Sequence, residues 1–114
     1  MYMVDHIAIR VSDLDLAQQW YEKQLGAKLQ FKGQFYRRMS LNNIALALID
    51  ENQYPDNHIG VLVENIDSLP NVGTRIEHRD GTIGVYVKDP FGNTVEYIWY
   101  STKAKKIMEG NNEV

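Results

Sequence analysis

The sequence of 114 residues contains no cysteine, only three prolines and only three histidines. The lack of cysteine excludes a disulfide framework, a thiolate nucleophile and cysteine-bound zinc, so any metal must be held by histidine or carboxylate side chains. No apolar run approaches the roughly 20 residues of a membrane-spanning helix, and no basic stretch precedes a long apolar one at the N-terminus. We therefore expect a soluble, cytoplasmic protein that does not engage a membrane.

An excess of positive charge is also missing. Lysine and arginine number 12 against 15 aspartates and glutamates, which gives a formal net charge of −3. Nucleic-acid-binding domains normally carry a basic surface, so we expect no nucleic-acid partner. With 44% hydrophobic and 24% charged residues, the composition is that of an ordinary globular domain, and the length suits one core.

An internal repeat organises the chain. Residues 5–15 align with residues 57–67 at an offset of 52 positions, with four identities and mostly mild differences elsewhere. Such self-similarity indicates two copies of one structural module of about fifty residues. We predict a first module over residues 1–52, a second over 53–100, and a polar tail over 101–114 that is frayed or weakly helical.

The first copy is predicted to fold as a strand, a helix and three further strands. Apolar and polar residues alternate over residues 4–11, as in a half-buried strand. Asp13 follows as a helix N-cap, apolar residues then recur at a spacing of three to four, and Gly26 ends the run. The strands that follow are expected at residues 28–31, 35–41 and 44–49.

The second copy is shorter in its helical part. A strand is expected at residues 58–63, and Pro70 limits the following helix to about one turn. Three strands are then expected at residues 74–77, 84–88 and 94–100. The chain is thus predicted to be an α+β protein built from two βαβββ modules, with the second helix reduced.

Two histidines occupy the same position of the repeated strand. His6 and His58 lie on the face opposite the isoleucine and valine row, and the next residue on that face is small, Ala8 or Gly60. Glu96 lies between apolar neighbours on the last strand, where an unpaired carboxylate would be costly to bury. Two imidazoles and one carboxylate can hold a divalent ion with positions open for a substrate.

Structural roles compete with this interpretation. Each histidine could be a hydrogen-bonded structural residue, and Glu96 could pair with a nearby lysine or arginine. His78 falls in a polar cluster and is expected at the surface, and we expect Trp20 and Tyr21 in the core. Three aromatic residues are expected either to line a cavity or to pack between strands: Phe35, Tyr36 and Tyr86.

The sequence resembles the vicinal oxygen chelate superfamily, which includes glyoxalase I, methylmalonyl-CoA epimerase, extradiol dioxygenases and the fosfomycin- and bleomycin-resistance proteins. The resemblance extends from residue 1 to about residue 100 and is carried by residues 5–14, 20–26 and 87–96. It implies that the paired modules form curved mixed sheets around a cup-shaped site. It also implies that His6, His58 and Glu96 bind one divalent metal ion, which could be Mn, Fe, Ni, Zn or Co.

The resemblance further implies a metal-dependent lyase or transferase of the glyoxalase or fosfomycin-resistance type. Its substrate would be small, oxygenated and anionic, a thiol could be a cosubstrate, and the metal would act as a Lewis acid. Glyoxalase I and the epimerase use a fourth ligand at the position matched here by Leu46, which cannot coordinate a metal. Ala8 stands where fosfomycin-resistance proteins often have a hydroxyl residue. The alternative is a protein that sequesters a drug-like molecule without chemistry, as the bleomycin-resistance proteins do.

Substrate contacts and partners complete the expectations. Arg10, Arg38 and Tyr86 are candidate substrate-binding residues. Further basic residues could neutralise an anionic substrate: Arg75, Arg79, Lys103 and Lys105. Half a cup alone would expose a large apolar surface, so the modules must pair within one chain or across a homodimer. The resemblance favours a homodimer, and the ligands could come from one chain or from two.

Overall fold

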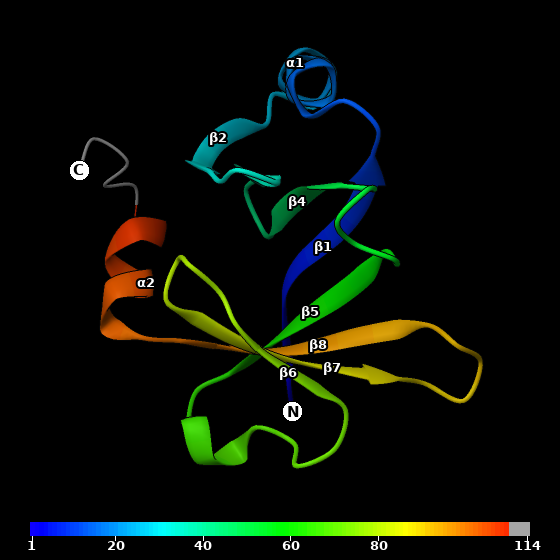
Figure 1. Ribbon diagram of the computed structural model, residues 1–114. Coiled ribbons are helices and arrows are strands. Elements are labelled where there is room, and N and C mark those ends of the chain that lie inside the picture. The colour runs from blue at the N-terminus through cyan, green and yellow to red at the C-terminus, as the bar shows by residue number, and fades with distance from the viewer. Residues whose placement is uncertain (110–114) are drawn as a thin grey trace.

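A single sheet of eight strands runs through both modules, and Figure 1 shows that it is curved. The computed structural model describes residues 1–109. Module one consists of β1 (Met3–Val11), α1 (Leu14–Leu25), β2 (Lys28–Lys32), β3 (Tyr36–Ser40) and β4 (Ala45–Asp50). Module two consists of β5 (His58–Val63), η1 (Ile66–Ser68), β6 (Thr74–Glu77), β7 (Thr82–Lys88) and β8 (Thr94–Tyr100), and is followed by α2 (Thr102–Met108). The predicted α+β class and order of elements are confirmed.

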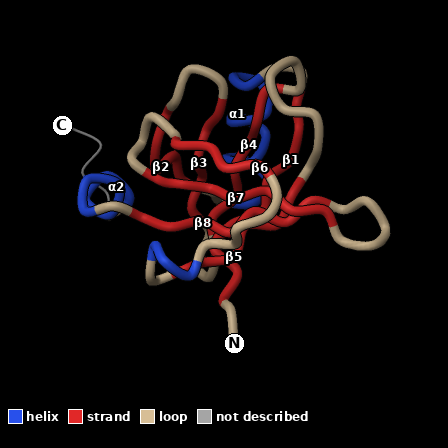
Figure 2. The backbone as a smooth tube through the Cα atoms, turned by 60° about the horizontal axis from the view of Figure 1, so that its bottom comes forward, coloured by secondary structure: helices blue, strands red, loops and turns tan. Residues whose placement is uncertain are grey.

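The two modules have the same strand pairing and are joined at the centre of the sheet. The strand order is β2-β3-β4-β1-β5-β8-β7-β6. β1 pairs in parallel with β4, as β5 does with β8, and β1 meets β5 in an antiparallel pair in which Ile7 faces Ile59. The sheet curls, so that β2, β3 and β4 lie across from β6 and β7 (Figure 2). The concave side of this curl holds the cavity described below.

Helix α1 covers the outer face of module one. The Asp13 side chain accepts a hydrogen bond from the Leu16 backbone N–H at 3.0 Å, and Gly26 ends the helix at a positive φ of 65°. Tyr21 packs against buried β3 and β4 side chains, whereas Trp20 is 54% exposed. The prediction that Trp20 lies in the core is wrong, because neighbouring residues on a helix point about 100° apart.

The second module replaces that helix with a short turn of 3-10 helix. Asn65 caps η1, and Pro70 follows one residue after Leu69 closes it. Leu69 packs with Val63 and Val85 in a separate core cluster on the outer side of this module. The reduced second helix is therefore confirmed, and its physical cause is the proline that stops the turn.

The tail differs from its prediction. Residues 102–108 form a docked helix in which Ala104 is fully buried and packs against Ile98 and Tyr100. Ser101 caps the helix by accepting a hydrogen bond from the Ala104 backbone N–H at 3.1 Å. Met108 of the same helix packs against this cluster as well, so two apolar residues within a polar segment dock the helix. Residues 110–114 lie outside the described residues, and no helix among the described residues is long and apolar enough to cross a membrane.

Candidate metal centre

Three neighbouring strands place the predicted ligands together. Gly60 on β5 pairs with His6 on β1 at one side and with Glu96 on β8 at the other, and His58 lies two residues earlier on β5. A side chain at Gly60 would overlap the His6 ring, and one at Gly84 on β7 would overlap the Glu96 carboxylate. The two glycines therefore create the space that the three functional side chains occupy.

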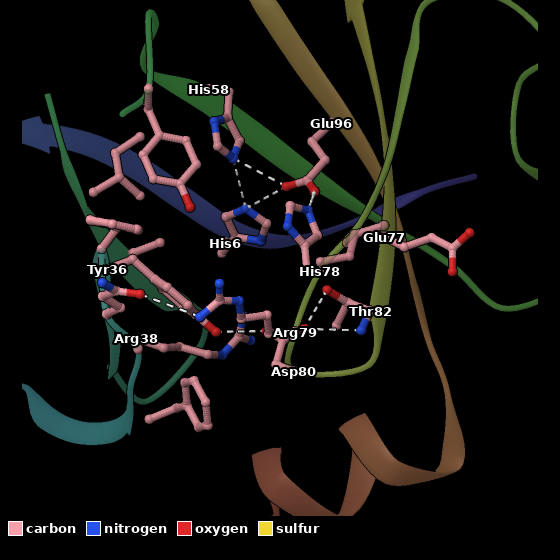
Figure 3. A pocket seen from close by; sticks show the side chains of 18 of the residues that line it. His6, Tyr36, Arg38, His58, Glu77, His78, Arg79, Asp80, Thr82 and Glu96 are labelled. Carbon is pink, nitrogen blue, oxygen red and sulfur yellow. Dashed lines mark hydrogen bonds and ion pairs between the residues drawn. The ribbon is translucent and has the colours of Figure 1, made fainter. Parts of the chain in front are cut away.

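The ligand atoms of His6, His58 and Glu96 form a tight triangle (Figure 3). The two histidine Nε2 atoms are 3.1 Å apart, and each lies 3.1 Å from Glu96 Oε1. All three side chains are at most 5% exposed. The site is thus assembled within one chain, and three potential metal ligands converge in a buried position.

While His6 is neutral, hydrogen bonding alone does not satisfy this triangle. His6 Nδ1 lies 2.7 Å from Asp5 Oδ2, so a neutral His6 ring donates its one N–H to Asp5 and turns a lone pair toward the triangle. His58 has at most one proton on Nε2 to share between two acceptors. One contact of the triangle then sets two lone pairs against each other, and a cation removes this conflict.

The electrostatics of the site favour a bound cation as well. Burial by itself raises the pKa of Glu96, but hydrogen bonds from His58, His6 and His78 hold this pKa well below its ordinary value. Burial lowers the pKa of His6, yet its hydrogen bonds to Asp5 and Glu96 and their charges outweigh that effect and raise the pKa. Glu96 therefore stays ionised, and its buried negative charge calls for positive charge nearby.

The donor set fits a divalent ion. Ligands about 2.1 Å from a tetrahedral ion lie roughly 3.4 Å from one another, close to the 3.1 Å separations of this triangle. Two imidazole nitrogens and one carboxylate oxygen suit Mn, Fe, Co, Ni or Zn and leave other coordination positions for a substrate.

A cavity of about 460 Å³ opens in front of the triangle. Residues of both modules line it, among them five aromatic side chains: Phe31, Phe35, Tyr36, Tyr54 and Tyr86. Of the two roles considered for Phe35, Tyr36 and Tyr86, lining a cavity or packing between strands, the structure shows the first. Tyr36 also ties the modules together, because its hydroxyl donates a hydrogen bond of 2.6 Å to Asp80. Burial and the Asp80 charge raise the pKa of Tyr36, so this phenol stays protonated.

His78 is the site residue that sequence reasoning missed. It lies in the turn between β6 and β7, where its Nε2 is 3.1 Å from Glu96 Oε2 and 3.3 Å from the Tyr86 hydroxyl. The side chain is 22% exposed and lines the cavity, so its assignment to the surface is wrong. The available signal was the Asp80-Gly81 turn, which makes a hairpin of the two strands and brings His78 beside Tyr86.

The fourth-ligand position also needs correction. Leu46 is buried among outer-face side chains beneath α1, not in the cavity. The cavity side of β4 carries Ala47 and Ile49 instead, because side chains alternate along a strand. Ala47 pairs with Ala8 in the same way that Glu96 pairs with Gly60. Ala47 therefore occupies the place in module one that Glu96 occupies in module two.

The candidate substrate contacts separate into two groups. Arg38 and Tyr86 line the cavity, as does Arg79, whose guanidinium donates to Gln34 at 3.3 Å. Arg10 is not among the lining residues, because its side chain donates hydrogen bonds to the carbonyls of Glu51 and Tyr54. Three of the basic residues proposed to neutralise a substrate are likewise absent from the lining: Arg75, Lys103 and Lys105.

Comparisons with known proteins identify the family. The model of the Glyoxalase/Bleomycin resistance protein/Dioxygenase superfamily matches residues 3–83, most of the chain, so the protein belongs to this superfamily. A methylmalonyl-CoA epimerase in complex with methylmalonyl-CoA and NH4+ is 15% identical, with a TM-score of 0.70 over 90% of this chain and 96% of that one.

Two further solved structures have a fold similar to that of this chain. A hypothetical protein from Bacillus halodurans C-125 is 13% identical, with a TM-score of 0.69 over 88% of this chain and 95% of that one. The methylmalonyl-CoA epimerase from Mycobacterium tuberculosis is 20% identical, with a TM-score of 0.63 over 90% and 91% of the two chains. At these identities the likeness establishes the fold, and the reaction must be argued from the site.

Proposed function

We propose that the protein is a divalent-metal-dependent enzyme in which His6, His58 and Glu96 hold the ion. The observation that carries this proposal is the buried triangle of ligand atoms, each 3.1 Å from the others, beside a cavity of about 460 Å³. Solved structures of similar fold include methylmalonyl-CoA epimerases, which supports an enzymatic role for the cup.

The substrate we propose is small, oxygenated and anionic, and the reaction is of the lyase or transferase type. A bound divalent ion would act as a Lewis acid toward adjacent substrate oxygens. Ala47 leaves the side of the triangle next to β4 without a fourth ligand, which keeps room for those oxygens. Arg79 at the cavity supplies a positive charge, and the Tyr86 hydroxyl and His78 supply polar hydrogens beside Glu96.

Metal content tests the proposal. Protein purified without chelator is expected to contain about one divalent ion per chain, and His6→Ala, His58→Ala and Glu96→Ala are each expected to lose it. Glu22→Ala, on the exposed face of α1, is the matched control and should keep the ion. Absence of binding even with excess Mn, Ni, Zn or Fe(II) would contradict the proposal. If the ion is found, the metal-loaded protein is screened with epoxides and hemithioacetals, with and without thiol cosubstrates.

The aromatic walls of the cavity favour a second candidate, a protein that sequesters an organic molecule without chemistry. Five aromatic side chains provide a large stacking surface. The His58→Ala variant separates the two candidates. Under the first, the variant loses both metal and activity, and under the second it captures an aromatic ligand nearly as well as the wild type.

We also propose that the protein forms a homodimer, although its ligand triangle needs only one chain. Ile7 and Ile59 face each other across β1 and β5 on the side of the sheet opposite the cavity, and they are 39% and 48% exposed. Sedimentation velocity is expected to give twice the monomer mass of 13.2 kDa, and Ile59→Lys should shift the protein toward the monomer.

A further inference from the structure

Asp5 lies beside the ligand His6 although the two are neighbours in one strand. The pairing of β1 with β5 is irregular between Val4 and His6. Val4 faces Val61 and His6 faces Gly60, so two residues that are adjacent on β5 face two residues of β1 that have Asp5 between them. Asp5 is therefore the extra residue of a β-bulge, which re-aims a side chain that would otherwise point to the opposite face. As a result, the Asp5 carboxylate reaches the back of the His6 ring.

The contact between the two side chains is specific. Asp5 Oδ2 lies 2.7 Å from His6 Nδ1, and the Asp5 side chain is 11% exposed. Accepting the Nδ1 hydrogen fixes which ring nitrogen is protonated and turns the lone pair of Nε2 toward His58 and Glu96. His6 is thereby held in the one tautomer and orientation that a metal ligand at Nε2 requires.

Asp5 is itself held in place by residues of three other elements. The Tyr100 hydroxyl on β8 donates to Asp5 Oδ2 at 2.7 Å, and the Arg38 guanidinium on β3 lies 3.3 Å from the same oxygen. Arg38 Nε donates to the Gln30 side chain on β2 at 2.9 Å, and the Gln30 amide donates to the Met108 carbonyl in α2. We call Asp5, Arg38, Tyr100 and Gln30 the Asp5 clamp.

The repeat supplies an internal comparison. Asn57 precedes His58 as Asp5 precedes His6, but Asn57 is exposed, and its side-chain oxygen accepts from the Arg10 backbone N–H at 2.7 Å. The preceding residue therefore gives His58 no carboxylate. His58 is instead packed edge-on between the rings of His6 and Tyr86, at centroid distances of 5.2 and 5.3 Å.

We infer that Asp5 is a positioning residue of the metal centre, which acts through His6 without binding the ion, and that the Asp5 clamp ties this role to α2. The inference rests on the proposed metal-dependent function. Asp5 contacts the triangle through the His6 ring, whereas Arg38 of the clamp also lines the cavity, so Asp5 is the clamp residue whose substitution tests this role. Loss of such a partner typically weakens metal binding about 10- to 100-fold.

Zinc affinity, measured by competition with a chromophoric chelator, tests the inference. Asp5→Ala is expected to weaken binding about 10- to 100-fold. Asp5→Asn keeps an oxygen that can accept from His6 and is expected to lose less. Tyr100→Phe should cause a smaller loss of affinity, because Tyr100 acts on His6 through Asp5. Gln30→Ala should cause the smallest loss, because Gln30 reaches Asp5 only through Arg38. Asn57→Ala is the matched control and should stay within about twofold of the wild type.

A second readout does not depend on metal. In metal-free protein, nitrogen NMR of His6 is expected to report the Nδ1-protonated tautomer in the wild type and a mixture of tautomers in Asp5→Ala. Should Asp5→Ala fail to fold, the zinc affinity and the His6 tautomer of Asp5→Asn and Tyr100→Phe are compared with those of the wild type instead. Equal zinc affinities and an unchanged His6 tautomer would overturn the role of Asp5 and leave the proposed function standing. A wild type that binds neither Zn nor Mn, Ni or Fe(II) would instead remove the proposed function, while the tautomer would still show whether Asp5 orients His6.

Discussion

Module one and module two share their strand pairing and differ in what they give to the cavity. Module one has the full helix α1 of 12 residues and contributes one candidate ligand, His6. Module two has only the three residues of η1 and contributes His58, Glu96 and the adjacent His78. Module one thus has the long covering helix, and module two has most of the polar side chains at the cavity. The two copies are more alike in strand pairing than in the residues that they place at the site.

The strand register shows which positions of the two modules are equivalent. Ala8 pairs with Ala47 in module one, and Gly60 pairs with Glu96 in module two. The two pairs are equivalent, so one module has a small apolar side chain where the other has a carboxylate. The asymmetry leaves three candidate ligands, where two alike modules would supply four, and keeps one side of the triangle open to the cavity.

The largest effect is expected from Glu96→Gln. This change keeps the shape of the side chain and removes the buried negative charge that three histidines surround. Metal affinity should fall by more than about 100-fold, since a ligand contributes more than the partner that orients it. Isothermal titration with Zn²⁺ measures the loss. Glu22→Gln, the same carboxylate-to-carboxamide change on the exposed face of α1, should leave affinity unaltered.

Gly60→Ala is expected to come next. The new Cβ would overlap the His6 ring, so the ring or β5 must move, at a cost of about 1–3 kcal/mol. Both the unfolding free energy and metal affinity should fall, as measured by urea denaturation and metal titration. The module-one counterpart Ala8→Gly introduces no clash. It should cost about 1 kcal/mol through backbone entropy and keep the ion. Equal metal affinities in the two variants would contradict this account of the site.

Ala47→Glu should make the two modules alike. A carboxylate on the cavity side of β4 would become a fourth ligand, and metal affinity should rise by about tenfold, as expected for a gain of about 1.4 kcal/mol. Without metal the new buried charge should lower the melting temperature, and adding Zn²⁺ should raise it more than in the wild type. A rise in melting temperature with metal no larger than that of the wild type would show that this position does not face the ion.

Asp89→Ala should have the smallest effect, on the turn that precedes β8. The hydrogen bonds from the Asn93 side chain, the Asn93 backbone and the Phe91 backbone hold the pKa of Asp89 below its ordinary value of 3.8. The carboxylate therefore stabilises the fold above that pH, and the contribution is lost as the pH falls below it. The melting temperatures of wild type and variant should differ at pH 7, and the difference should shrink as the pH falls below 3.8.

The sequence was sufficient for the frame and for the three residues of the triangle. The repeat made His6 and His58 equivalent, and Glu96 was joined to them by the cost of burying an unpaired carboxylate and by the family resemblance of residues 87–96. These features depend on strand periodicity, which a sequence displays directly. Their role as metal ligands remains a prediction for experiment.

The remaining features depend on register, which periodicity does not reveal. Asp5 faces His6 only because of a bulge that breaks the alternation of β1. His78 reaches Glu96 only through the exact pairing of the β6–β7 hairpin, and Ala47 rather than Leu46 faces the cavity because of the starting point of β4. A shift of one residue reverses each of these assignments.

Anomalous diffraction from crystals grown with Mn²⁺ or Zn²⁺ tests the central claim most directly. The account predicts one strong peak per chain, at about 2.0–2.2 Å from His6 Nε2, His58 Nε2 and a Glu96 carboxylate oxygen. A peak located elsewhere, or no peak while these three atoms remain in direct contact with one another, would contradict it.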